Sequence, residues 1–141
     1  MPGNMSVALQ DGLADLIFRS RAYTADAVLA IALASGIPTA SQGANAFSEW
    51  QNAGGYVRQT LVPSTSNWAY NAASGAIVNM VAVTFPVCTA PGGWVSGIML
   101  LNSSGYGVGT PLAWGAVTTP KYYDVNDQAT FPSGSLAFTF S

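Results

Sequence analysis

The sequence predicts a mainly β domain, a β-sandwich or barrel, with one α-helix near the N-terminus. Three observations predict it. A length of 141 residues is that of one ordinary domain. Most of the chain consists of short apolar or alternating segments separated by Gly, Pro, Asn and Ser, and such punctuation is typical of all-β folds. Apolar residues recur with convincing helical spacing in only one stretch, so a parallel α/β sheet is not expected.

The helix is expected over residues 6–20. Asn4 or Ser6 can cap its first turn, because a short polar side chain accepts a hydrogen bond from a backbone N–H that has no partner within the helix. Leu9 and Leu13 begin a series of apolar residues spaced three or four apart, which places them on one face.

The remaining segments of β character follow at short intervals. The continuous apolar run 27–33 predicts a strand buried on both faces, although its alanine content leaves a short helix open. Proline cannot donate to a strand ladder, so Pro111 and Pro120 are expected to bound a strand over 112–117. The other expected strands are 56–62, 76–80, 81–85, 94–101 and 135–140, with 122–125 as a shorter candidate.

The pattern divides the chain into a helical segment, residues 1–24, and a β domain, residues 25–141. A long loop is expected at 36–55 within the β domain, where a turn or two of helix would point Phe47 and Trp50 inward. Loops of this length are usually functional or mobile. In a structural protein, the function would be a reach towards a neighbouring subunit.

Charged residues are scarce, at 7% of the chain with a net charge of −2. Mixed surface charge normally keeps monomers apart, so this scarcity favours a surface partly covered by partners; a monomer hydrated by hydroxyls and amides is the alternative. Four basic residues supply no basic stripe for nucleic acid. No apolar run is long enough to cross a membrane. One cysteine and no recognisable secretory signal fit synthesis in a reducing compartment.

Candidate chemistry is sparse. The chain has no histidine, the commonest general base and metal ligand. Cys88 has no activating base nearby in sequence, so a half-buried thiol at the end of a strand is the better interpretation. Asp124 and Asp127 could be a carboxylate pair or a weak calcium loop, but a turn held by side-chain to backbone hydrogen bonds is favoured. We therefore expect no enzyme activity, no cofactor, no metal and no small-molecule substrate.

Two further patterns have structural interpretations. The glycine-rich stretch 105–111 departs from the dinucleotide fingerprint, because a proline would interrupt the helix that the fingerprint must open, and a turn is expected. Trp50, Trp68, Trp94 and Trp114 are expected mostly in the core, because tryptophan buries a large area. A sugar-binding platform built from exposed tryptophans is the alternative, and it would make the chain a stand-alone carbohydrate-binding sandwich.

Taken together, the segments resemble a family of small tailed-phage virion proteins, often labelled tail fibre-like or capsid decoration proteins. The resemblance covers nearly the whole chain. It lies in the order and spacing of LIFR at 16–19, AYT at 22–24, AVLAIAL at 27–33, GGYVRQ at 54–59, VAVTFP at 81–86, WVSGIM at 94–99, LAWGAVTTP at 112–120 and SLAFTF at 135–140. It implies a single jelly-roll-like antiparallel β-sandwich with one N-terminal α-helix, and a place in the virion after synthesis in the host cytoplasm.

Two positions in the particle remain open. A capsid decoration (cement) protein would stabilise contacts between capsomers, with the major capsid protein and copies of itself as partners. A tail fibre or tail adaptor component is the alternative, although fibres usually show length, repeats or heptads that this sequence lacks. A compact domain with long loops favours the cement role and a capsid surface position. Lattice contacts are expected from the helix, the loop 36–55 and the stretch 105–110, with the candidate interface residues Leu9, Leu13, Phe47, Trp50 and Tyr106.

Overall fold

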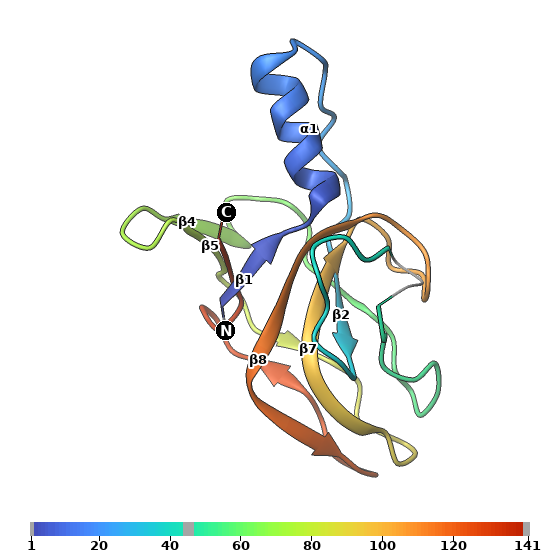
Figure 1. Ribbon diagram of the computed structural model, residues 1–141. Helices are drawn as coiled ribbons and strands as arrows, with labels where there is room; N and C mark the ends of the chain where they lie inside the picture. The colour runs from blue at the N-terminus through green and yellow to red at the C-terminus, as the bar shows by residue number, and fades with distance from the viewer. Residues whose placement is uncertain (1, 44–46, 140–141) are drawn as a thin grey trace.

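A computed structural model describes residues 2–43 and 47–139, and within them the chain is mainly β with one helix (Figure 1). Eight strands form one curled sheet in the order β3-β2-β7-β8-β1-β10-β5-β4, while β6 and β9 pair separately. The elements are β1 (Pro2–Met5), α1 (Val7–Phe18), β2 (Ala30–Ala34), β3 (Gln59–Thr60), β4 (Trp68–Asn71), β5 (Ala76–Asn79), β6 (Val83–Thr84), β7 (Gly93–Leu101), β8 (Pro111–Tyr123), β9 (Thr130–Phe131) and β10 (Ala137–Thr139).

The main sheet is mixed. β1 pairs in parallel with β10, so strands from the two ends of the chain lie side by side (Figure 1). On its other edge β1 pairs antiparallel with β8, and the remaining pairings among the described strands are also antiparallel. The predicted fold class is therefore confirmed as mainly β with one helix. The purely antiparallel arrangement is not, because the parallel β1–β10 pair makes the sheet mixed.

The core lies on both faces of β2 and β7, as predicted for the apolar run 27–33. Every residue of β2 is buried. Successive side chains of a strand point to opposite faces, and the buried residues divide accordingly. Ile31 and Leu33 pack in the larger apolar cluster, whereas Ala32 and Ala34 pack with Met99 on the other face. The strand begins at Ala30, three residues later than the apolar run suggested.

The loop 36–55 lies against this sheet. Phe47 packs over Ala32 and Ala34, while Trp50 joins the larger cluster, and both side chains are only 4% exposed. The predicted inward orientation of these two residues is confirmed. The described part of the loop contains no helix; its backbone is held by bonds such as that from the Trp50 N–H to the Leu33 carbonyl, 2.8 Å long. Phe47 and Trp50 thus attach the described part of the loop to the sheet.

Strand boundaries differ from the prediction where proline or glycine is present. β1 was not predicted, since Pro2 and Gly3 disfavour strands in isolation. β8 continues through Pro120 because an irregularity in its pairing with β7 falls there: Val95 pairs with Lys121, but Gly97 pairs with Ala116. A proline in such a bulge removes no ladder hydrogen bond. β4 and β9 were also not predicted, and β3 is shorter than the segment 56–62.

The helix α1 projects away from the sheet (Figure 1). Ser6 caps it: the hydroxyl accepts a hydrogen bond from the Leu9 N–H at 3.2 Å and donates to the Pro111 carbonyl at 2.6 Å. The predicted helix is confirmed within two residues at its C-terminal end. Beyond it, Ser20 adopts a left-handed conformation (φ 53°) and the chain returns alongside the helix, where Tyr23 packs closely on Gly12.

Candidate interaction site

A buried ion pair joins Glu49 to Arg58. The guanidinium donates two hydrogen bonds of 2.7 Å, from Nε to Oε1 and from the terminal nitrogen to Oε2 of the carboxylate. The two side chains are only 1% (Arg58) and 3% (Glu49) exposed. Bidentate geometry of this kind gives the strongest and most directional carboxylate contacts.

The pair also holds the backbone of the loop between β7 and β8. Arg58 donates to the carbonyl oxygens of Ser103 and Val108, both at 2.8 Å. Glu49 accepts the Gly107 N–H at 3.1 Å. We call this set the Glu49–Arg58 cluster: the two charged side chains, Tyr56 and the backbone they bind at 103–108. It locks the loops 36–55 and 102–110 to each other.

Tyr56 completes the cluster. Its hydroxyl donates to Glu49 Oε1 at 3.0 Å and accepts the Leu33 N–H of β2 at 3.1 Å. Burial, reinforced by the neighbouring Glu49 carboxylate, raises the pKa of Tyr56 well above its ordinary value. The phenol therefore stays protonated and ties the cluster to the central strand.

Sequence reasoning missed this cluster, although a signal was present. Between Asp26 and Lys121, the sequence contains only two charged residues, Glu49 and Arg58. Isolated opposite charges in an apolar stretch are buried only when paired, so their pairing could have been proposed. The carbonyl partners on the other loop could not, because they come from residues 45 and 50 positions further along the chain.

The carboxylates predicted to stabilise a turn do so. Asp124 accepts a hydrogen bond from the Val125 N–H at 2.7 Å, and Asp127 accepts one from the Asp124 N–H at 2.8 Å. Cys88 is a free thiol that is buried (4% exposed) and lies outside the strands, not half-buried at a strand end as predicted, and burial together with the nearby Asp127 and Asp124 raises its pKa. Within residues 2–43 and 47–139, no three His, Cys, Asp or Glu side chains gather as metal ligands would.

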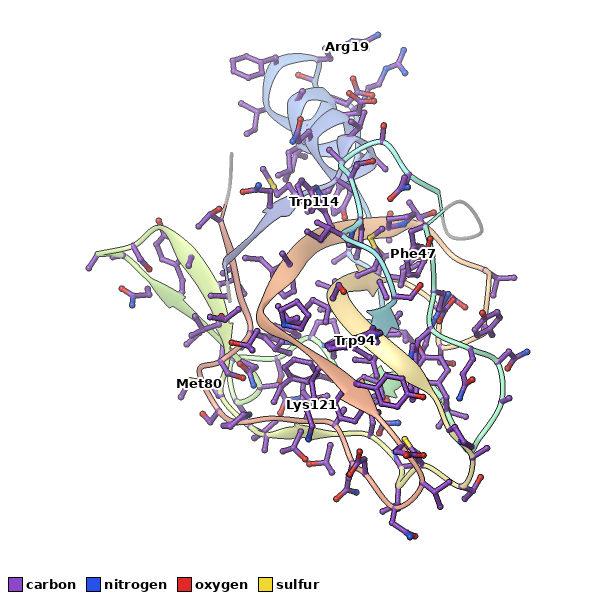
Figure 2. All side chains as sticks on the ribbon, turned by 60° about the horizontal axis from the view of Figure 1, so that its bottom comes forward. Arg19, Phe47, Met80, Trp94, Trp114 and Lys121 are labelled. Carbon is purple, nitrogen blue, oxygen red and sulfur yellow. The ribbon has the colours of Figure 1, made fainter. Side chains whose placement is uncertain are left out.

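The projecting helix presents apolar side chains to solvent. None of its residues is buried. Exposure rises towards its far end, from 46% at Leu16 to 67% at Ile17 and 83% at Phe18. We call these three residues the apolar tip. Arg19 marks the same end of the helix in Figure 2, remote from Trp94 and Lys121 on β7 and β8. No helix in the described part of the chain is long and apolar enough to span a membrane.

An apolar groove lies at the base of the same helix. It consists of two adjoining cavities of about 250 and 230 Å³ that share four lining residues. The shared residues, which define the groove, are Leu9, Leu29, Pro63 and Leu100. Trp68 and Phe138 line one cavity, and Tyr23 and Asp26 line the other. The groove is therefore almost wholly apolar, with one carboxylate.

The structure separates the five candidate interface residues. Leu9 and Leu13 lie half-buried on α1, and Leu9 lines the groove. Tyr106 is 41% exposed in the loop 102–110, with its hydroxyl 3.4 Å from the Glu49 carbonyl. Phe47 and Trp50 fill the core, so their side chains offer no surface to a partner. The apolar tip, which is more exposed than any of the five, was not among them.

One tryptophan departs from the expected core position. Trp94 is 57% exposed and lies opposite Tyr122, itself 45% exposed, with ring centroids 5.9 Å apart. Trp50 is buried, and Trp68 and Trp114 are half-buried against the apolar clusters, in agreement with the prediction. Trp94 and Tyr122 thus form an exposed aromatic pair on β7 and β8.

These features define a β-rich module with a projecting arm and surfaces suited to contact with other molecules. The family described as Podophage GP4 fiber I protein gp80 matches residues 4–139. The chain belongs to this family and is a bacteriophage virion structural protein, as the resemblance of its sequence segments implied. No match to a curated protein was found.

Proposed function

We propose that this chain is a fibre component of the podophage particle that acts through contacts and catalyses no reaction. The observation that carries the proposal is the projecting helix α1, none of whose residues is buried in its own chain. Large exposed apolar surfaces on a folded protein mark contacts with other molecules. The family description, a fiber protein, supports the same placement.

A compact module can serve in a fibre although it has no repeats or heptads. The length of the fibre would come from several joined chains, and the projecting helix α1 would form one of the contacts between them. The Glu49–Arg58 cluster keeps the loops 36–55 and 102–110 in one conformation, which suits a fibre component that must present a constant surface. We expect copies of this chain and other virion proteins as partners, and neither nucleic acid nor membrane.

Capsid decoration is the competing placement. It is favoured by the scarcity of charge and by loops that could lie across a lattice of the major capsid protein. The two placements differ in copy number. Quantitative mass spectrometry of purified particles, relative to the major capsid protein, is the test. A few to a few dozen copies per particle are expected for a fibre component, and hundreds would overturn that placement in favour of capsid decoration.

A carbohydrate contact is a second candidate function, favoured by the exposed Trp94–Tyr122 pair. Aromatic rings with an exposed face can pack against the apolar face of a sugar. Quenching of tryptophan fluorescence by host surface polysaccharide, lost in Trp94→Ala, would support it. Tyr70→Ala is the matched control, because Tyr70 is an exposed aromatic residue (61%) on β4. Equal quenching in wild type and Trp94→Ala would exclude this role for the pair.

A further inference from the structure

The side chains of the apolar tip of α1 are suited to insertion into a cavity. Successive helix residues are rotated by about 100° from each other, so Leu16, Ile17 and Phe18 point to three sides of the helix. A helix that is apolar all round is normally buried. The tip is instead the most exposed apolar part of the helix, with Phe18 at 83%. It therefore fits a cavity better than a flat surface.

The apolar groove is such a cavity. Its two parts, about 250 and 230 Å³, together fall within the range of about 300–1,000 Å³ typical of small-molecule sites. That volume has room for the side chains of Ile17 and Phe18. The walls are of matching character, with Trp68 and Phe138 on one side and Leu29 and Pro63 shared between the two parts.

The charges at the two places are complementary. Beside the tip, Arg19 and Arg21 share a single carboxylate, Asp15, at 2.9 and 3.8 Å, which leaves that end of the helix positive. The groove contains the Asp26 carboxylate, which accepts a hydrogen bond of 3.0 Å from the neutral side chain of Asn102. Bringing tip and groove together thus pairs opposite charges.

The tip cannot enter the groove of its own chain. The groove lies at the base of α1, since Leu9 lines it, and the helix runs from there away from the sheet (Figure 1). A helix of 12 residues is about 18 Å long, so its tip lies about that far from its base. Two helices packed antiparallel, one from each copy, would place each tip at the base of the other.

We propose that the apolar tip of α1 docks into the apolar groove of a second copy, reciprocally, to form a two-fold dimer. The area supports reciprocal exchange: Leu16, Ile17 and Phe18, which are 46%, 67% and 83% exposed, present together roughly 300 Å² of apolar side-chain surface. One tip in one groove would bury only about 600 Å² in total, the scale of incidental contacts. Two tips in two grooves would bury about 1,200 Å², the lower limit for a specific interface. This inference rests on the proposed contact role and deepens it by naming the partner.

Analytical ultracentrifugation over a concentration series tests the dimer. Wild type is expected to sediment at twice the 14.5 kDa of one chain. The double variant Ile17→Ser, Phe18→Ser is expected to raise the dissociation constant at least about a hundredfold, because each dimer loses two buried tips. The control Ile37→Ser, Val57→Ser alters two other exposed apolar residues (60% and 57%) outside the helix and should leave the dimer intact.

Two further variants locate the contact. Arg19→Glu with Arg21→Glu should weaken the dimer, and added Asp26→Lys should restore it in part.

In a Cys88→Ser background, chains with Phe18→Cys mixed with chains with Pro63→Cys should form a mixed disulfide under mild oxidation. A monomer at every concentration, or an oligomer that the tip variant leaves unchanged, would overturn the inference. Neither outcome alters the copy number per particle, so the proposed placement is tested separately.

Discussion

An arginine contacts a carboxylate at the end of helix α1 and another does so between the loops 36–55 and 102–110, and the two contacts have opposite surroundings. Arg58 lies 2.7 Å from Glu49 with both side chains almost fully buried. Arg19 lies 2.9 Å from Asp15, but 60% of the Arg19 side chain and 30% of Asp15 are exposed. The distances are nearly the same. Water screens the exposed pair, whereas the buried pair has lost its hydration and depends on its partners.

The difference teaches that burial, not distance, decides what each contact does. The buried pair fixes two loops in place, because a buried charge without its partner is costly. The exposed pair, Asp15 and Arg19, lies one turn apart at the end of α1 and connects the helix to no strand. One end of the molecule is thus held in a single arrangement, and the other presents apolar side chains for a partner.

The largest expected effect is that of Arg58→Met. It leaves the Glu49 carboxylate buried and unpaired, which should lower the free energy of unfolding by about 3–5 kcal/mol. For a domain of this size the midpoint of thermal unfolding should fall by about 10–20 °C. Circular dichroism during heating measures it.

The matched control is Arg19→Met, which should cost at most about 1 kcal/mol because the pair is exposed. The double variant Glu49→Gln, Arg58→Met should be more stable than Arg58→Met alone, since no buried charge remains. Equal losses for Arg58→Met and Arg19→Met would contradict the contrast between the two ends.

A smaller loss of stability than that of Arg58→Met is expected from Gly3→Ala, which tests how firmly the segment before the helix is held. An added Cβ would meet the Trp114 carbonyl oxygen of β8 and lie 2.8 Å from Cδ1 of Phe138. Because backbone must shift to make room, we expect a cost of about 1–3 kcal/mol in urea unfolding. Gly36→Ala is the control, since its new Cβ would lie 3.9 Å from Ser48, an ordinary contact. Similar stability of both variants would mean that β1 is loosely held.

Removal of the helix cap should lower the free energy of unfolding by less than Gly3→Ala does. Ser6→Ala loses the bond from the Leu9 N–H and the bond to the Pro111 carbonyl, both at the base of α1. A lost cap costs about 1 kcal/mol, and amide hydrogen exchange at Leu9 should become faster. Ser41→Ala, an exposed serine in the neighbouring loop, is the control. Unchanged exchange at Leu9 would show that the cap does not hold the first turn.

Much of this contrast could not be predicted from the sequence. The helix was predictable because Ser6 and the leucine spacing act within one or two turns, and β2 because its apolar run is continuous. The direction of the helix was not, since its base is set by the Ser6 N–H bond to the Leu112 carbonyl, more than 100 residues away. The groove likewise gathers residues as distant as Leu9, Pro63 and Phe138. Local sequence patterns predict individual helices and strands, whereas the groove depends on which of these elements pack together.

The smallest expected effect is that of Phe18→Ala on the isolated monomer. Phe18 is 83% exposed, so its truncation should change the free energy of unfolding by no more than about 0.5 kcal/mol. Phe138→Ala is the comparison, because Phe138 is 5% exposed and its loss should cost about 3–5 kcal/mol. Urea unfolding at low protein concentration, where any dimer has dissociated, measures both. A cost above about 1 kcal/mol for Phe18→Ala would mean that the tip packs against its own chain, and the helix would then be a part of the fold, not an arm.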